Sequence, residues 1–263
     1  MSSSSNAELA GLHAVVTGGG SGIGAAVARE LLRQGARVTL MGRSHERLLA
    51  QREALAREGW TVALQSCDVA DEAQVTRAFA AAVQEQGVVD ILVNNAGQVQ
   101  TAPFAKTSLA QWQQMLQVNL TGSFLCTQQV LPGMAVRGFG RVINVASTAA
   151  LKGYAYVSAY CAAKHGVLGL TRALALEMAG KGVTVNAVCP GYTDTEIVAR
   201  AVDTIVAKTG RDADTARREL ATANPQGRLI RPEEVAHTVA WLAQRGSAAI
   251  NGQAIAVCGG ETA

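Results

Sequence analysis

The feature that most constrains this chain is a glycine-rich stretch near its start, Thr17-Gly18-Gly19-Gly20-Ser21-Gly22-Ile23-Gly24. The apolar segment 12–16 before it is typical of a buried parallel strand. An Ala- and Leu-rich segment with helical spacing follows and ends at Gly35. Between a strand and a helix, glycines let backbone N–H groups approach a pyrophosphate at the positive end of the helix dipole. This context favours a nucleotide-binding loop over one that is merely flexible.

Length and composition favour a single folded unit. The chain has 263 residues, 49% of them hydrophobic and 16% charged, which indicates a large buried core. No Pro-, Gly- or Ser-rich linker and no block of charge divides it. We therefore expect one domain over residues 11–263, preceded by a disordered polar tail over residues 1–10.

Charge and cysteine usage exclude several classes of function. The net charge of +3 is small and dispersed, so we expect no nucleic-acid partner. No apolar run approaches the ~20 residues that cross a bilayer, and the polar start lacks the apolar core of a signal peptide. We expect a cytoplasmic protein without a membrane partner. The five cysteines lack CxxC spacing, which favours reduced thiols and no metal site.

Strand-like and helical segments alternate along the whole chain. The expected strands are 12–16, 37–41, 61–65, 88–93, 141–145, 183–188 and 254–257. The expected helices are 25–32, 44–58, 71–87, 108–131, 158–179 and 233–242, with a more polar helical lid over about 193–224. This alternation predicts an α/β fold in which a doubly wound parallel sheet of about seven strands carries helices on both faces.

In such a sheet, ligands bind beyond the carboxyl ends of the strands. Five polar or glycine-bearing segments each follow a strand directly, so we expect them to meet at one edge of the sheet. These segments are the glycine loop, Asp68, Asn94-Asn95-Ala96-Gly97, Ser147 and Pro190-Gly191.

Tyr160 and Lys164 are four residues apart on one expected helix and therefore share a face. A tyrosine titrates near pH ~10, and lowering that pKa to about 7 requires roughly 4 kcal/mol of differential interaction. The Lys164 ammonium and the positive ring of an oxidised nicotinamide could supply it together. Tyr160 would then be a general acid for carbonyl reduction, with Ser147 holding the substrate oxygen. Taken alone, the pair is more typical of an ordinary helix surface than of an active site.

In combination, these motifs resemble the short-chain dehydrogenase/reductase family. The glycine loop, Asn94-Asn95-Ala96-Gly97, Asn119, Ser147, Tyr160, Lys164 and Pro190-Gly191 occur in the family's order, with thirteen positions from Ser147 to Tyr160. The resemblance covers about residue 11 to the C-terminus. It implies a Rossmann domain and a homotetramer in which helices 108–131 and 158–179 pack across an interface.

The resemblance also assigns residues. Asn119, Ser147, Tyr160 and Lys164 would form a catalytic tetrad, in which Asn119 holds a water that connects Lys164 to solvent. Several of the cofactor-binding positions could equally be turn or capping residues. The positions that would contact the cofactor are Gly18, Gly20, Ser21, Gly22, Ile23, Gly24, Asp68, Val69, Asn95, Ala96, Gly97, Tyr160, Lys164, Pro190, Gly191, Thr193 and Thr195.

The choice of cofactor depends on the end of the second strand. A carboxylate there would bond the adenosine ribose hydroxyls and repel a 2′-phosphate. Here Gly42 leaves room for the phosphate, and Arg43 offers it a charge-assisted fork. We therefore expect NADP(H) rather than NAD(H), although Arg43 could also be a solvated base beside a helix.

Segments 147–156, 189–191 and 256–260 look similar to 3-oxoacyl and polyketide ketoreductases, and the lid looks similar to that of 3-hydroxybutyrate dehydrogenases. The leading hypothesis is an NADPH-dependent ketoreductase acting on a β-keto substrate. The alternatives are an NAD-linked dehydrogenase of 3-hydroxy acids or secondary alcohols and a nucleotide-sensing protein without turnover. The expected substrate-pocket residues are Gln98, Ala149, Tyr154, Tyr156 and Tyr192.

Overall fold

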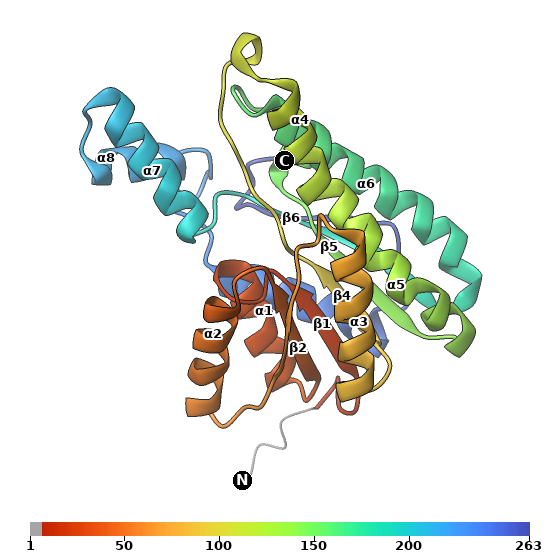
Figure 1. Cartoon of the computed structure of the whole chain (residues 1–263). Helices are drawn as coiled ribbons and strands as arrows, with labels where there is room; N and C mark the ends of the chain where they lie inside the picture. Colours follow the sequence, from red (N-terminus) through yellow and green to blue (C-terminus); the bar gives the residue numbers. More distant parts are fainter. Residues whose placement is uncertain (1–6) are drawn as a thin grey trace.

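A computed structural model describes residues 7–263 and contains one sheet of seven parallel strands (Figure 1). The strands are hydrogen-bonded in the order β3-β2-β1-β4-β5-β6-β7, so the chain reverses direction across the sheet between β1 and β4. The expected doubly wound α/β fold is confirmed. The strands are β1 (His13–Thr17), β2 (Arg37–Gly42), β3 (Ala63–Ser66), β4 (Ile91–Asn94), β5 (Gly140–Val145), β6 (Val183–Pro190) and β7 (Ala254–Val257).

Helices cover both faces of this sheet. Buried residues of α1, α2 and α9 join one core cluster, and those of α3, α5 and α6 join the other. The helices are α1 (Gly22–Arg33), α2 (His45–Arg57), α3 (Glu72–Gln86), α4 (Leu109–Leu116), α5 (Gly122–Arg137), α6 (Ser158–Met178), α7 (Glu196–Thr209), α8 (Ala213–Ala221) and α9 (Pro232–Ala243).

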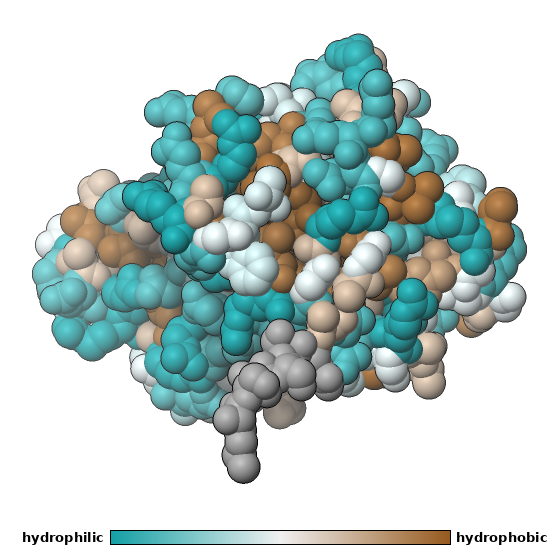
Figure 2. All heavy atoms as spheres, turned by 90° about the horizontal axis from the view of Figure 1, so that it is seen from below, coloured by the Kyte–Doolittle hydropathy of each residue, from teal (hydrophilic) through white to brown (hydrophobic). Residues whose placement is uncertain are grey.

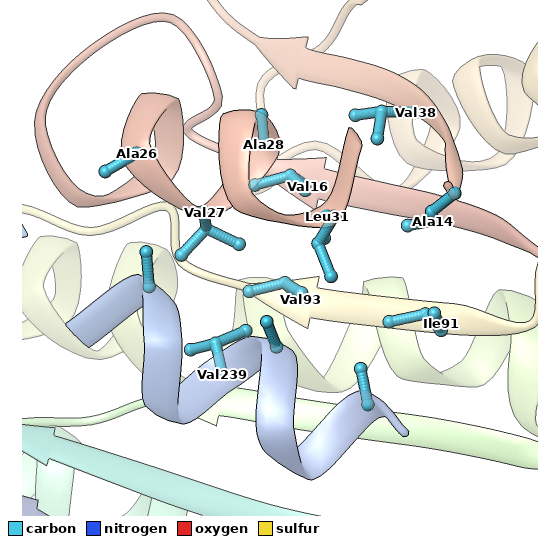
Figure 3. Packing of buried hydrophobic residues seen from close by; sticks show 14 of the residues in the cluster. Ala14, Val16, Ala26, Val27, Ala28, Leu31, Val38, Ile91, Val93 and Val239 are labelled. Carbon is cyan, nitrogen blue, oxygen red and sulfur yellow. The ribbon is translucent and has the colours of Figure 1, made fainter. Parts of the chain in front are cut away.

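The strands are apolar at successive positions because each of them is buried on both sides. Along β1, Val16 joins the cluster under α1 and α9, whereas Val15 joins the opposite cluster. Figure 3 shows Val27 of α1 and Val239 of α9 packed over Val93 of β4. The glycine loop therefore stands on a strand and a helix that are both held in the core.

The helix expected over 108–131 differs from the structure in one respect. It divides into α4, a π-helical segment (Gln117–Thr121) and α5, which continues to Arg137. Asn119 lies in the π-helical segment, and its side-chain Nδ2 donates to the Met115 carbonyl oxygen at 3.0 Å. A side chain that bonds into the helix backbone disturbs the regular ladder, as π-bulges at functional sites often do.

The helical lid expected over 193–224 consists of α7 and α8, which project away from the sheet (Figure 1). The part of the expected tail that the structure describes, residues 7–10, forms a turn in which Leu9 is fully buried. Residues 1–6 lie outside the described residues. Figure 2 shows a mostly hydrophilic surface on the underside, with scattered apolar groups. Within residues 7–263, no helix has the length and hydropathy needed to cross a bilayer.

One buried histidine makes the stability of this fold depend on pH. His13 on β1 has no exposed surface; its Nδ1 donates to the Gly87 carbonyl oxygen at 2.9 Å and its Nε2 lies 2.9 Å from the Thr39 hydroxyl. Burial lowers the pKa of His13 from 6.5 because the charged ring would lose its hydration. The unfolded chain therefore takes up the proton first.

We expect the stabilisation from neutral His13 to be complete above pH 6.5 and to be lost as the pH falls below that value. Urea unfolding between about pH 5 and pH 8 would measure this, with His13→Asn as the comparison. The free energy of unfolding of the variant should fall less steeply with acid than that of the wild type. Parallel curves would contradict the assignment.

Candidate active site

The glycine loop between β1 and α1 can form only without side chains at particular positions. Gly18 and Gly22 have φ angles of +65° and +53°, and a Cβ on Gly24 would lie 2.3 Å from the Gly18 carbonyl oxygen. Ser21 occupies the N-cap position of α1, yet its side chain makes no capping hydrogen bond. The first N–H groups of α1 are therefore left without a side-chain cap, which suits them to bind an anion.

Asn95, directly after β4, ties this loop to the neighbouring strand. Its Nδ2 donates to the carbonyl oxygens of Thr17 at 2.9 Å and Gly18 at 3.3 Å. The Thr17 hydroxyl in return accepts from the N–H groups of Asn95 and Ala96. The carboxyl ends of β1 and β4 are thus locked together, as expected at the reversal of strand order.

Gly97 connects this rim to the residues of the proposed tetrad. A Cβ on Gly97 would lie 2.8 Å from Asn119 Oδ1 and 3.7 Å from Lys164 Nζ. Asn119 Oδ1 accepts from the Gln98 N–H at 3.2 Å, and Asn119 Nδ2 donates to the Gln98 carbonyl oxygen at 2.9 Å. The side-chain amide of Asn119 is therefore already engaged, and the water-holding role implied for this residue remains a prediction.

Tyr160 and Lys164 lie on α6 and Ser147 follows β5, as expected. Lys164 is buried, and its Nζ donates to the Val145 carbonyl oxygen at 2.9 Å and lies 5.6 Å from the centre of the Tyr160 ring. Ser147 caps the short turn of residues 148–150 and also hydrogen-bonds Tyr160. Three of the four tetrad side chains therefore meet at one place, and Gly97 links the fourth to them.

Burial moves the pKa values of Tyr160 and Lys164 in opposite directions. It raises the pKa of the partly exposed Tyr160 to about 12, which the hydrogen bond with Ser147 only partly offsets. It lowers the pKa of Lys164 to about 8. The lowered pKa expected for Tyr160 depends on a bound oxidised nicotinamide as well as on Lys164, and the chain's own groups alone keep the phenol protonated. This protonation state is the one that a general acid requires.

At the end of β2, the structure reveals a cation that the sequence analysis missed. Gly42 leaves open space, since its Cβ would meet only Leu48 at 3.6 Å, and Arg43 beside it is exposed. Arg47, on the first turn of α2, lies against the glycine loop, since a Cβ added to Gly20 would be 3.2 Å from the Cβ of Arg47. Arg47 also pairs with Glu196 of α7 at 2.8 Å. The position of Arg47 at the start of the helix that follows Gly42 was the feature of the sequence that could have identified it.

Residues at the carboxyl ends of β3 and β4 make contacts within the protein itself. The Asp68 carboxylate accepts from the Ala70 N–H at 3.0 Å, and the Val69 side chain is buried against Gly122 of α5. The Asn94 side chain does not reach the edge of the sheet where its segment was expected to meet the others, because its buried Nδ2 donates to Thr127 and Asn144 at 2.9 Å. A cofactor contact at these positions therefore remains a prediction.

The turn after β6 links the sheet to the lid. Pro190 ends β6, and the Gly191 N–H donates to the Val257 carbonyl oxygen at 3.0 Å. The Thr193 hydroxyl donates to the Gly191 carbonyl oxygen, and the Thr195 side chain lies 3.2 Å from where a Cβ of Gly22 would be. These contacts place the start of the lid directly over the glycine loop.

The expected substrate-pocket residues do not all face the same way. Ala149 is buried, and Tyr154 and Tyr192 meet edge to face with ring centres 6.3 Å apart. Tyr156 is 67% exposed in a left-handed conformation with φ 67°, so its ring lies largely in solvent. The buried Nε2 of Gln98 has no hydrogen-bond partner within residues 7–263.

A further buried residue at this edge, Glu261, contacts Tyr154 from the C-terminal segment. Nothing local in the sequence connects two residues so far apart. Within the described part of the chain, no group of three or more His, Cys, Asp or Glu residues could hold a metal ion. All five cysteines are buried and free.

Comparisons with known proteins agree with this geometry. A profile of the family described as short chain dehydrogenase matches residues 12–205. A ketoacyl reductase ascribed to the granaticin polyketide synthase of Streptomyces violaceoruber is 43% identical over 94% of this chain and 92% of its own. The D-beta-hydroxybutyrate dehydrogenase of Cupriavidus necator is 37% identical over 93% of this chain and 95% of its own. The crystal structure of an actinorhodin polyketide ketoreductase variant with NADPH superposes with a TM-score of 0.92 at 40% identity, covering 95% of this chain and 97% of that one.

The glycine loop yields a direct test of its packing. We expect Gly24→Ala to destabilise the protein by about 1–3 kcal/mol, since the added methyl group would overlap the Gly18 carbonyl group 2.3 Å away. Gly246→Ala is the matched control, because nothing lies within 4 Å of its Cβ position. Chemical denaturation should show a loss for the first variant and a change under about 0.5 kcal/mol for the second. Equal stabilities would contradict the packing.

Proposed function

This chain belongs to the short-chain dehydrogenase/reductase family of NAD(P)-dependent oxidoreductases acting on CH–OH or C=O groups, and we propose that it is an NADPH-dependent ketoreductase. The reaction would reduce a carbonyl group, most readily that of a β-keto compound, to a secondary alcohol. The alternative within the family is a dehydrogenase that uses NAD to oxidise a 3-hydroxy acid or a secondary alcohol.

The observation that carries the proposal is the continuity between the glycine loop and the buried lysine. A Cβ on Gly18 would lie 3.1 Å from the Ala96 Cα, and the next residue, Gly97, adjoins Lys164 Nζ. A dinucleotide with its pyrophosphate at the N-terminus of α1 would therefore reach Tyr160 and Ser147 along the rim formed by residues 95–97. These contacts argue against a nucleotide-sensing protein without turnover, because sensing would not require a phenol in this environment.

When bound, NADPH would supply a hydride to the carbonyl carbon. The chain's residues would do the rest. The Ser147 hydroxyl would donate to the carbonyl oxygen and orient it, and Tyr160, kept protonated by burial, would transfer its proton to that oxygen as negative charge develops. Lys164, close beneath the ring, would stabilise the resulting phenolate. Asn119 would hold residues 97–98 in place.

The proposed preference for NADP(H) rests on charge at the end of β2. The residue at the end of β2 is Gly42 and not an acidic residue, and the guanidinium groups of Arg43 and Arg47 lie on the segment that follows. Arginine offers bidentate hydrogen bonds to phosphate oxygens. A solved relative at 40% identity was crystallised with NADPH.

The substrate and the assembly are proposed from features of the surface. Two of the relatives are polyketide ketoreductases by name, which favours a β-keto substrate, and the paired rings of Tyr154 and Tyr192 favour a broad one. We also propose that residues 11–263 fold as one domain and assemble as a homotetramer through the helical region 108–131, which comprises α4 and most of α5, and through α6. Val136 of α5 and Leu176 of α6 are 89% and 82% exposed, and burying them would stabilise such an interface.

Replacing the proposed acid tests the chemistry. We expect Tyr160→Phe to lower kcat for ketone reduction by about 10²- to 10⁴-fold, the range that general acid catalysis contributes. The dissociation constant for NADPH, measured by nucleotide fluorescence, should change by less than about threefold, because the ring remains in place. Undiminished reduction by this variant would rule out Tyr160 as the proton donor.

Replacing Gly42 tests the cofactor proposal. We expect Gly42→Asp to weaken NADPH binding at least about tenfold, or ~1.4 kcal/mol, through repulsion of the 2′-phosphate, and to leave NADH binding equal or tighter. Gly42→Asn is the neutral control of the same shape, and a Cβ at this position would make only an ordinary contact with Leu48 at 3.6 Å. Isothermal titration with each nucleotide gives the ratio. A ratio that Asp and Asn change equally would show that charge at this position does not decide the preference.

A further inference from the structure

A buried carboxylate at the end of the chain has no role in the chemistry described above. Glu261 follows β7 in the C-terminal segment, which lies against the loop between β5 and α6 and the turn after β6. Its side chain is only 1% exposed. A carboxylate at that depth is destabilising unless it is paired and hydrogen-bonded, so its partners show what it is fitted to do.

Those partners lie on the loop between β5 and α6. Glu261 Oε1 accepts a hydrogen bond from the Tyr154 hydroxyl and lies 3.1 Å from Lys152 Nζ. Lys152 also donates to the main-chain carbonyl oxygen of Glu261 at 3.4 Å. Glu261 Oε2 has no hydrogen-bond partner in the described chain and packs against Gly191, where a Cβ would lie 3.0 Å away. The Glu261 carboxylate thus lies between the loop that carries Lys152 and Tyr154 and the turn that carries Gly191.

Through Tyr154, this contact reaches the turn that carries Ser147. The Tyr154 hydroxyl lies 2.6 Å from the Thr148 hydroxyl. Because a carboxylate can only accept, the tyrosine proton is directed to Glu261, and Thr148 donates to the phenol oxygen in turn. Thr148 is the first residue of the turn that Ser147 caps.

The other side of Tyr154 faces a second aromatic residue. Its ring meets Tyr192 at an interplanar angle of 85°, and Tyr192 is close enough to Tyr160 to raise its pKa further. Tyr154 and Tyr192 together form what we term the aromatic wall, beside the turn that carries Ser147. Edge-to-face pairs are modestly stabilising, so an anchored hydroxyl group matters for keeping one ring in place.

We propose that Glu261 is a positioning residue that sets the width of the substrate pocket by holding Tyr154 in the aromatic wall. This inference rests on the proposed ketoreductase function, since it assigns a wall to that substrate site. A flat, bicyclic ketone would pack against the wall, whereas a short acyclic β-keto ester would not reach it. Glu261 therefore favours broad cyclic substrates without taking part in the proton transfer.

The test compares Glu261→Ala, Tyr154→Phe and the double variant on two substrates, 2-tetralone and ethyl acetoacetate, with NADPH. Each variant should raise KM for 2-tetralone about fivefold or more, and Glu261→Ala should leave kcat/KM for ethyl acetoacetate within about twofold. The double variant should be no worse than either single one, because both changes break the same contact. Glu261→Gln, which keeps an oxygen acceptor for Tyr154, should restore most of the lost affinity.

Glu58→Ala is the control, because it removes a carboxylate from an exposed ion pair with Arg29 at 2.8 Å. Equal losses on both ketones, or additive losses in the double variant, would overturn the positioning role. A second readout does not need turnover. Amide hydrogen exchange over residues 148–154 should be faster in Glu261→Ala than in the wild type, and unchanged exchange would also overturn the inference. If the wild type reduces neither ketone while this exchange still responds, the proposed function fails and the anchoring of Tyr154 stands.

Discussion

Parallel strands hydrogen-bonded into one sheet expose two apolar faces, and the whole chain is arranged to bury both of them. Every return from one strand to the next passes through a helix on one face, so all seven carboxyl ends meet at the same edge. Because every strand ends at that edge, the backbone there consists of turns and not of regular sheet. The polar and glycine-bearing turns collect at this edge, and the site is built from them.

Close backbone approach is the second requirement of the site. Gly24 of α1 lies against the Gly18 carbonyl group, and Gly97 lies against the Asn119 side chain. Because glycine has no side chain, the loops at the edge of the sheet can approach the helices this closely. Hydrogen bonds from Asn95 and Asn119 hold these approaches in place. Loops fixed in this way keep a binding surface organised before a ligand arrives, which reduces the entropic cost of binding.

Burial also affects the ionisation of the two groups proposed to react. The same low-dielectric surroundings that keep Tyr160 protonated lower the pKa of Lys164 to about 8, so burial favours the neutral form of both side chains. The carboxylate of Glu261 is paired with Lys152 and accepts a hydrogen bond from Tyr154. The site is therefore a cluster of buried polar groups in which each group depends on its neighbours, as in other satisfied networks.

The amino-acid sequence by itself determined the fold class, the strand and helix succession and the shared helix face of Tyr160 and Lys164, because periodicity and strand-end position are local properties. It placed the helix containing Asn119 but not its π-helical turn, since that turn depends on a side chain bonding across to Gln98 and Met115. Only the tertiary structure decided that Asn94 points into the core, that Tyr156 faces solvent, that Arg47 adjoins the glycine loop and that Glu261 reaches Tyr154. Each of these depends on the direction of a side chain across a large sequence separation, and hydrophobic patterning carries no information about such contacts.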